Sequence, residues 1–277
     1  MTSLAHPLIR YHGGKFRLSS WIISHFPAHQ TYVEPFCGGA SVLLQKERSR
    51  FEVLNDKDDD VVNLFRVLRD SEKSLELAKA IDLTPYSRTE FFDAFQYTED
   101  EIERARRLVI RAQMGFGSAG ATKGNTGFRL NSARGGGDIV TIWQRQSKII
   151  LQAAARLKEV LIENRDALKV IEDHDREDTL FFIDPPYILS TRTMGGNAYR
   201  HELTNSQHIE LIDRLLSCRG MVIVCGYSHP IYDDALSKWK KVEKSVSAAG
   251  QSGGVKRTEC LWINKSAQQH DLLGGAA

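Results

Sequence analysis

The sequence has few cysteines, no long apolar run and no familiar metal-binding motif. Its 277 residues include four cysteines, without metal-ligand spacing or a disulfide framework, which predicts a reducing, cytoplasmic setting. No apolar run is long enough to span a membrane, and the opening MTSLAHP lacks the pattern of a secretory signal. The nine histidines form no HExxH-like pattern, so we expect no metal site.

Acidic residues are absent from one long stretch. Residues 104–134 contain no Asp or Glu, and the whole chain has a net charge of only +2. This asymmetry predicts a face that binds a polyanion, although a solvated helix face is an equal alternative for the first three arginines. The stretch has seven basic residues: Arg104, Arg106, Arg107, Arg111, Lys123, Arg129 and Arg134.

The segment 179–187 is the clearest candidate for a site. Its apolar residues 180–183 are bounded by charge and by two prolines, which predicts a buried central strand. In an open α/β sheet, ligands bind at the carboxyl ends of the strands. The strand ends in Asp184-Pro185-Pro186-Tyr187.

This tetrapeptide combines rigid acceptors with an aromatic face. Proline fixes its own φ and restricts the residue before it, so the two carbonyls and the Asp184 carboxylate are held in one arrangement. Neither proline has an N–H group, so the cluster suits a substrate amine with two N–H bonds to donate. Tyr187 offers a face for a planar ring, and a planar ring with an exocyclic amine is a nucleobase. The alternative is a plain strand-ending turn.

A glycine-rich βα unit precedes this segment. Residues 32–44 predict a strand, a turn and a helix, and residues 51–56 a second strand that ends in Asp56. Such a carboxylate commonly binds ribose hydroxyls, yet the turn departs from the dinucleotide fingerprint. We therefore expect a nucleoside-type cofactor. Tyr11 and Lys15 flank a Gly-Gly turn and could contact it, or belong to a plain loop. Asp166 could accept from an adenine amine, or act as a helix N-terminal acid.

The remaining pattern predicts an α/β, doubly wound, Rossmann-like sheet with an inserted, mostly helical domain at 72–139. The sheet domain would comprise 1–71 and 140–265, and 266–277 would be a disordered tail. Eight of the residues at 115–137 are glycine, which indicates a functional or disordered loop. We expect helices at 15–26, 58–71, 75–81, 88–96, 99–114, 142–156, 166–171, 205–216 and 231–236. The further strands are expected at 160–162, 221–226, 241–246 and 258–263, with a flexible loop at 247–254.

Several of these motifs, in this order, closely resemble those of the Dam-type DNA adenine-N6 methyltransferases. They are the YHGGK at 11–15, the VEPFCGGA at 33–40, the Asn-Asp at 55–56, the DPPY at 184–187 and the RTECLWIN at 257–264. The resemblance implies S-adenosyl-L-methionine as methyl donor, S-adenosyl-L-homocysteine as product, and a target-recognition domain in the insertion. It places these residues around the cofactor: Tyr11, Lys15, Glu34, Pro35, Phe36, Cys37, Gly38, Gly39, Ala40, Ser41, Asp56, Asp166 and Asp184.

The expected substrate is double-stranded DNA. Its binding residues would be Arg88, Arg111, Lys123, Asn125, Arg129, Asn131 and Arg134. The sequence departs from the family at Ala40, where a second glycine is common, and in the 111–134 region, which matches GATC-specific members poorly. The site GATC is therefore only one candidate. We expect a monomer of bacterial or phage origin, in a restriction–modification, housekeeping or phage setting.

The predicted chemistry is methyl transfer to a flipped-out adenine. Asp184 and the Pro185 carbonyl would accept the two N6 hydrogens, and Tyr187 would stack on the base. Two alternatives stay open. One is methylation of another amino group, such as cytosine N4 or an RNA base. The other is a catalytically inactive DNA-binding regulator.

Overall fold

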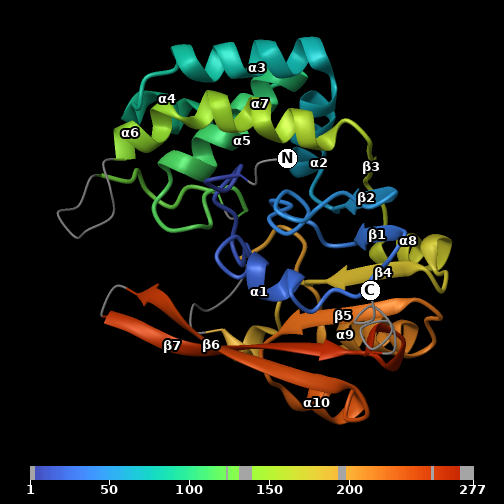
Figure 1. Cartoon of the computed structure of the whole chain (residues 1–277). Helices are drawn as coiled ribbons and strands as arrows, with labels where there is room; N and C mark the ends of the chain where they lie inside the picture. Colours follow the sequence, from blue (N-terminus) through green and yellow to red (C-terminus); the bar gives the residue numbers. More distant parts are fainter. Residues whose placement is uncertain (1–3, 123, 131–138, 193–197, 251–252, 269–277) are drawn as a thin grey trace.

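The fold is built on one seven-stranded sheet in the order β3-β2-β1-β4-β5-β7-β6 (Figure 1). The computed structural model describes residues 4–122, 124–130, 139–192, 198–250 and 253–268. The strands are β1 (Thr31–Glu34), β2 (Phe51–Asn55), β3 (Val160–Glu163), β4 (Thr179–Ile183), β5 (Met221–Gly226), β6 (Lys240–Gly250) and β7 (Gly253–Ile263).

The first five strands are parallel, and the chain reverses its direction across the sheet at β1. There β1 pairs with β2 on one side, with Val33 opposite Val53, and with β4 on the other, with Val33 opposite Phe181. The crossover that leaves β1 leads to β2, and the crossover that leaves β4 leads to β5, on the opposite side. The carboxyl ends of β1 and β4 are therefore the topological switch point of a doubly wound sheet. The predicted Rossmann-like fold is confirmed.

Both faces of the sheet are covered, as the alternation along β4 shows. Leu180 and Phe182 belong to one buried cluster, which also contains apolar residues of α2, α3, α5 and α7. Phe181 and Ile183 belong to the other, with residues of α8, α9 and α10. Because successive side chains of a strand point to opposite faces, this run of apolar residues needs helices on both sides.

The helices agree with the sequence in their order and differ in some bounds. One expected helix is shorter than predicted, and another is absent. The expected helix 15–26 is regular only over α1, and residues 41–46 after the glycine turn form turns rather than a helix. The expected helix 142–156 is divided into α6 and α7. The helices are α1 (Ser19–Ile23), α2 (Asp59–Arg69), α3 (Ser71–Leu83), α4 (Arg88–Asp93), α5 (Glu101–Met114), α6 (Ile139–Gln144), α7 (Gln146–Leu157), α8 (Ala167–His174), α9 (Asn205–Leu216) and α10 (Pro230–Ala235), with a 3₁₀ turn η1 (Leu189–Thr191).

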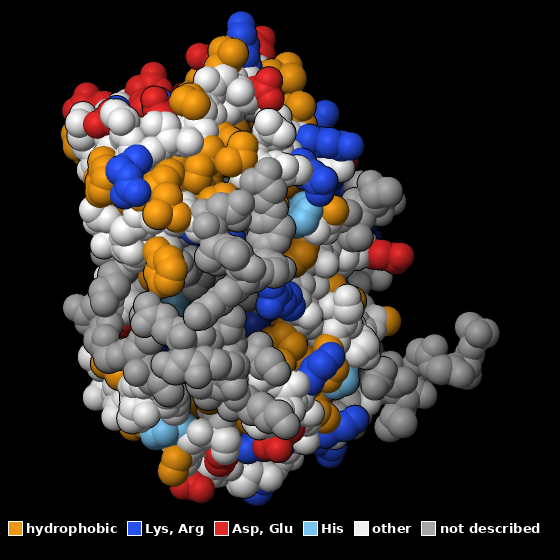
Figure 2. Space-filling model, turned by 90° about the vertical axis from the view of Figure 1, so that its left-hand side faces the viewer, with side chains coloured by type: hydrophobic (Ala, Val, Ile, Leu, Met, Phe, Trp, Pro, Cys, Tyr) orange, Lys and Arg blue, Asp and Glu red, His pale blue; other side chains and the backbone are white. Residues whose placement is uncertain are grey.

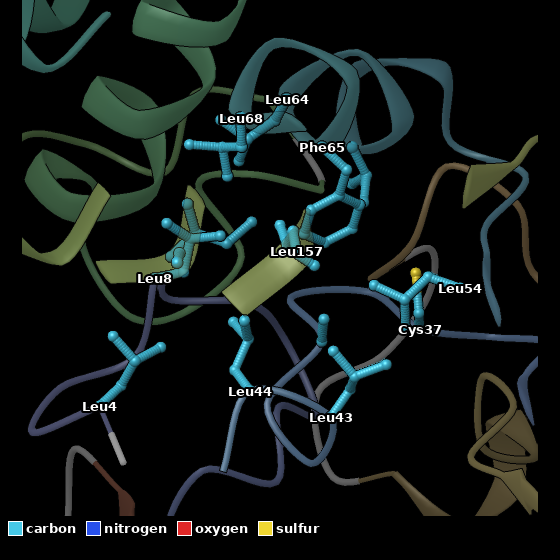
Figure 3. Packing of buried hydrophobic residues seen from close by; sticks show 14 of the residues in the cluster. Leu4, Leu8, Cys37, Leu43, Leu44, Leu54, Leu64, Phe65, Leu68 and Leu157 are labelled. Atoms are coloured by element: carbon cyan, nitrogen blue, oxygen red, sulfur yellow. The ribbon is translucent and has the colours of Figure 1, made fainter. Parts of the chain in front are cut away.

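The helical segment from α2 to α7 shares its hydrophobic core with the sheet. Figure 3 shows side chains of α2 and α7 facing those of the turn after β1 and of the N-terminal segment. Leu77 of α3 and Leu108 of α5, both fully buried, belong to the same cluster. Helices α3, α5 and α7 lie together beside the β2–β3 end of the sheet (top of Figure 1). The helical segment is therefore packed onto the sheet through a continuous apolar core.

The antiparallel edge is longer than the sequence indicated. β7 pairs with β5 and β6, and the β6–β7 ladder runs from Lys240–Ile263 to Gly250–Gly253. The flexible loop expected at 247–254 is thus wrong over most of its length, because backbone pairing continues from residues 247–250 to residues 253–256. The hairpin extends past the end of β5 (lower left in Figure 1).

The chain continues in order past β7. Residues 265–268 form a helical turn in which Ala267 is buried and the Gln268 side chain donates to the Ile263 carbonyl at 2.8 Å. The disordered tail predicted from about residue 266 stays a prediction, because residues 269–277 lie outside the described residues. Within the described part of the chain, no helix is long and apolar enough to cross a membrane.

Candidate active site

The glycine-rich turn after β1 is tied to the end of β2. Gly38, with φ of +47°, donates its N–H to Asp56 Oδ2 at 2.8 Å, and Cys37 donates to the Asn55 carbonyl at 2.9 Å. On β1 itself, Glu34 Oε1 accepts from the Tyr32 hydroxyl and from the Leu43 N–H, both at 2.8 Å. These bonds hold two acids of neighbouring strands at one edge of the sheet.

Two glycines leave room for tyrosine rings from other segments. A Cβ at Gly38 would lie 2.7 Å from Tyr11 Cε1, and a Cβ at Gly13 would lie 2.3 Å from the Tyr199 hydroxyl oxygen. Both glycines have positive φ, a conformation that costs other residues about 1–2 kcal/mol. The YHGGK motif and the turn after β1 thus interlock through Tyr11.

Ala40 occupies the same kind of backbone conformation without being glycine. Its φ is +49°, and its methyl group is fully buried in the core cluster. This is the position at which the sequence departs from the family pattern. The methyl group lies in the core, away from the cavity described next, so the departure does not narrow that cavity.

A cavity of about 800 Å³, partly open to solvent, lies at the carboxyl ends of β1, β2 and β4. We call it the first cavity. It is lined by every predicted cofactor residue except Pro35, Ala40 and Asp166. The structure thus brings together Tyr11, Lys15, Glu34, Phe36, Cys37, Gly38, Gly39, Ser41, Asp56 and Asp184.

The neighbours of Asp166, Asn164 and Arg165, bond to Asp56 and Asn55, but Asp166 itself does not line the first cavity. It is exposed and accepts a hydrogen bond from the Leu168 N–H at 3.0 Å, as the N-cap of α8. This is the helix N-terminal role that the sequence left open as one of two.

The pKa values of Glu34, Asp56 and Asp184 in the first cavity are raised, so these acids bind a proton more readily than they would in water. Burial raises the pKa of Glu34 to about 7, against the hydrogen bonds from Tyr32 and Leu43. Burial likewise raises the pKa of Asp56 to about 6, against backbone hydrogen bonds, and that of Asp184 to about 6, against the charge of Lys15. A ligand that brings positive charge or N–H and O–H donors would stabilise their ionised forms.

Lys15 occupies the centre of the site. Its ammonium group lies 2.9 Å from Asp184 Oδ1, donates to the Gly13 carbonyl at 2.5 Å and lies 4.7 Å from the centroid of the Tyr187 ring. Burial alone would lower the pKa of Lys15, but Asp184 and nearby groups raise it well above its ordinary value. A buried cation thus stands at the acceptors and ring that the sequence assigned to a substrate amine.

A second cavity, about 570 Å³ with its open part, lies on the other side of Lys15. We call it the second cavity. Lys15, His12, Gly13 and Tyr199 line both cavities, whereas Tyr187 lines only the second of the two. The second cavity is also lined by Ser118, Arg192, Tyr227, Arg257 and Glu259. The two cavities meet at the lysine that pairs with Asp184, an arrangement that suits the transfer of a group between two bound molecules.

The segment 198–203 covers part of the first cavity. Tyr199 donates to the His12 carbonyl at 3.2 Å, and Arg200 pairs with Asp58 at 3.2 Å and Asp60 at 2.7 Å. Tyr199, Arg200, His201 and Leu203 line the cavity. Sequence reasoning assigned them no role, because a polar loop after the DPPY motif has no periodicity that would predict where it folds back.

The predicted DNA-binding residues are placed unevenly. Arg111 is 8% exposed and pairs with Asp60 at 3.0 Å, so its charge does not face solvent. Asn125 accepts from the Gly127 N–H at 2.9 Å within its own turn. Arg88 is exposed, with its guanidinium 4.9 Å from the Phe128 ring centroid, and Arg129 is half-buried. Lys123, Asn131 and Arg134 lie outside the described residues.

The remaining arginines of α5 are paired with local acids. Arg104 pairs with Asp59 and Asp60 at 2.8 and 2.6 Å. Arg106 and Arg107 pair with Glu103 at 2.6 and 2.7 Å. These three arginines therefore fit the alternative interpretation, a helix face, and each of them pairs with a nearby acid. Lysine and arginine side chains are nevertheless visible on the face toward which the carboxyl edge points (Figure 2).

The doubly wound sheet, with its glycine-rich turn and acids at the ends of β1, β2 and β4, defines a Rossmann-like methyltransferase fold. The chain belongs to the D12 class N6 adenine-specific DNA methyltransferases, whose sequence profile matches residues 11–244. Members of this family are enzymes that methylate adenine in DNA. The predicted resemblance to the Dam-type enzymes is confirmed.

Curated relatives agree with this assignment. The chain is 23% identical over 273 residues to the type II methyltransferase M1.LlaDCHI of Lactococcus lactis subsp. cremoris, covering 93% of this chain and 95% of the relative. It is 23% identical over 261 residues to a DNA adenine methylase of Salmonella typhi, covering 87% and 89%. It is 24% identical over 257 residues to a DNA adenine methylase of Haemophilus influenzae, covering 87% of each.

Proposed function

We propose that this protein moves a methyl group from S-adenosyl-L-methionine to the N6 amine of an adenine that is flipped out of double-stranded DNA. The observation that carries the proposal is that the two cavities meet at Lys15, which pairs with Asp184 in the first cavity. A cofactor in the first cavity and a base in the second would approach each other at the acid that follows β4. Family membership supplies the reaction class, and this geometry supports the proposed roles of the residues.

The first cavity fits the proposed cofactor in charge and in hydrogen-bond acceptors. Asp56 uses one lone pair of each oxygen on backbone N–H groups, of Gly38 and Asp58, and so keeps acceptors for ribose hydroxyls. The carboxylates of Glu34, which is buried, and of Asp184, which is 17% exposed, complement an ammonium and a sulfonium group. The bound cofactor supplies an electrophilic methyl group. The chain's own residues would hold it beside Asp184.

The acceptors at the end of β4 would activate the amine. Asp184 and the Pro185 carbonyl would each accept one N6 hydrogen, which draws the nitrogen toward tetrahedral geometry and localises its lone pair. Acceptors fixed in advance by two prolines need no reorganisation as positive charge develops on the nitrogen. Because Lys15 already forms an ion pair with Asp184, the incoming amine would take the place of the ammonium group.

Base flipping is required because the N6 amine of a paired adenine has no access to the site. The N6 amine of a paired adenine cannot reach a buried carboxylate, so the base must leave the stack at a cost of about a few kcal/mol. Tyr187, which lines the second cavity, would return part of this cost by stacking on the base. Arg257 at the same cavity would lie toward the DNA backbone, whereas the Arg192 side chain is only 8% exposed and pairs with Glu202 at 2.8 Å.

The test combines purified protein, S-adenosyl-L-methionine and duplexes of varied sequence, with GATC as one of them. Mass spectrometry of the digested DNA should detect N6-methyladenine. Asp184→Ala should lower the rate by about 100-fold or more, whereas Asp213→Ala, on the exposed face of α9, should leave it unchanged. N4-methylcytosine as the product would support the rival substrate, and DNA binding without any methylated base would support the inactive regulator.

A further inference from the structure

Glu259 reaches the active site from the antiparallel strand of the sheet. On β7, Cys260 lies opposite Gly226, the last residue of β5, so Glu259 lies just beyond the carboxyl end of β5. Its side chain is buried, at 6% exposure, and lines the second cavity. Because β7 runs against its neighbour, a residue near the middle of this strand arrives at the same edge as Asp184.

The carboxylate of Glu259 holds the Tyr187 hydroxyl. The hydroxyl donates to Glu259 Oε2 at 2.7 Å and lies 3.4 Å from Cys225 Sγ on β5. The ring also packs edge to face against Tyr227, with centroids 4.7 Å apart and an interplanar angle of 73°. A hydrogen bond at one end and an aromatic contact on the ring leave Tyr187 little freedom to rotate.

Burying a carboxylate at this position lowers the stability of the fold, so its presence needs an explanation. Burying an ionised acid is unfavourable, and a nonpolar residue on β7 would pack against Cys225 without this cost. What the acid adds is direction: a phenol O–H prefers to lie in the plane of its ring, so donating to a fixed carboxylate favours one ring plane, which the contact with Tyr227 also restrains. The ring plane decides whether a planar substrate in the second cavity lies parallel to Tyr187.

We propose that Glu259 is a positioning residue that acts through Tyr187, and so sets the stacking plane for the methylated base. The inference rests on the proposed function, since it requires a base in the second cavity. It concerns no contact between Glu259 and the cofactor, because Glu259 does not line the first cavity. Its effect should therefore appear in the methylation rate on DNA and not in cofactor affinity.

The experiment measures single-turnover methylation of a duplex that the wild-type protein methylates. Glu259→Ala should lower the rate constant by about tenfold, the size expected for loss of one charge-assisted hydrogen bond. Glu259→Gln keeps an acceptor oxygen at the same place and should stay within about threefold of wild type. Glu243→Ala, an exposed acid on the neighbouring strand β6, is the matched control and should behave as wild type.

A double-mutant cycle separates positioning from a structural role. Tyr187→Phe keeps the ring but removes the hydroxyl, so it should slow methylation to a similar extent. If Glu259 acts through that hydroxyl, Tyr187→Phe combined with Glu259→Ala should be no slower than the slower single variant. Cofactor affinity, measured by calorimetry, should be the same in all variants.

The outcomes distinguish the two proposals. An inactive wild-type protein would count against the proposed function itself. An active wild type with an equally active Glu259→Ala variant would overturn the positioning role. Additive losses in the double variant, or a Gln variant as slow as the Ala variant, would overturn it as well, because both would place the effect outside the Tyr187 hydrogen bond.

Discussion

Lys15 Nζ and Asp184 Oδ1 lie 2.9 Å apart at the junction of the two cavities, with side chains only 4% and 17% exposed. Burial raises the pKa of Asp184 to about 6 even though Lys15 opposes the shift, and the pKa of Lys15 is raised well above its ordinary value. At neutral pH the two therefore form a buried ion pair. The acid is kept ionised, and thus able to accept from an amine, by a cation that the amine must displace.

Removing this cation should move the pH dependence of the reaction. In the wild type, activity should fall as the pH drops through about 6, because a protonated Asp184 loses accepting capacity. Lys15→Met removes the group that opposes the burial effect, so the pKa of Asp184 should rise and the acid limb should shift to higher pH. Single-turnover rates between pH 5 and 9, with Lys238→Met as a surface control, test this. An unshifted limb would show that Asp184 does not set it.

Glu34 predicts a second pH effect, on stability. Burial raises its pKa to about 7 from an ordinary 4.5, so the unfolded chain loses this proton first as the pH rises. The contribution of Glu34 to the free energy of unfolding is fully present below pH 4.5 and is lost as the pH rises through 7. Glu34→Gln keeps the oxygen that accepts from Tyr32 and Leu43 and removes this loss. The variant should be more stable than wild type at pH 8 by about 1–3 kcal/mol.

Urea unfolding of the cofactor-free protein at pH 5 and pH 8 measures the effect of Glu34→Gln. The variant's advantage should be much smaller at pH 5, where most of the wild-type carboxyl is protonated in the folded state. The same stabilisation at both pH values would mean that packing, and not the buried charge, is responsible. Cofactor affinity should fall in the variant, since it loses a carboxylate from the first cavity.

The sheet was predictable because its signals are local. Four adjacent apolar residues ending in Asp-Pro-Pro-Tyr predict β4 and its exposed end, and the spacing of Asp56 from the glycine turn predicts which acid lies beside it. Most predicted cofactor residues line one cavity for the same reason, since parallel strands bring their carboxyl ends to one edge. The hydrogen bond from Gly38 to Asp56 follows from that edge alone.

Interactions between distant segments were not predictable in this way. Counting charges within 104–134 left out Asp59, Asp60 and Glu90, which lie earlier in the chain and pair with arginines of α5. The position of Glu259 depends on the register of an antiparallel strand, which side-chain alternation does not fix. The return of Arg200 to Asp58 likewise depends on a loop without periodicity.

The contrast between two predicted DNA-binding arginines can be tested directly. Arg88 is exposed, so Arg88→Ala should leave stability nearly unchanged and should weaken DNA binding with a salt slope reduced by about 1. Arg111 is buried with Asp60, which also binds Arg104 and Arg200. Because Asp60 keeps those two partners in the variant, Arg111→Ala should destabilise the fold by about 1–3 kcal/mol, the range for lost hydrogen bonds to a charged group.

Urea unfolding and DNA titrations at several salt concentrations give both readouts for the two arginine variants. Equal stabilities would show that the pair between Arg111 and Asp60 contributes nothing to the fold. A salt slope unchanged by Arg88→Ala would show that this residue does not contact phosphate.

Gly38→Ala tests whether the turn after β1 is shaped for Tyr11. Gly117 is the matched control, since both glycines have positive φ, but a Cβ at Gly117 would meet nothing within 4 Å. Gly117→Ala should therefore lose only the backbone term, about 1 kcal/mol. At Gly38 the new methyl group would lie 2.7 Å from the Tyr11 ring and must displace it, so unfolding free energy and cofactor affinity should both fall further. Equal losses by urea unfolding, with unchanged cofactor affinity by calorimetry, would show that the Tyr11 ring moves aside freely and does not help to close the first cavity.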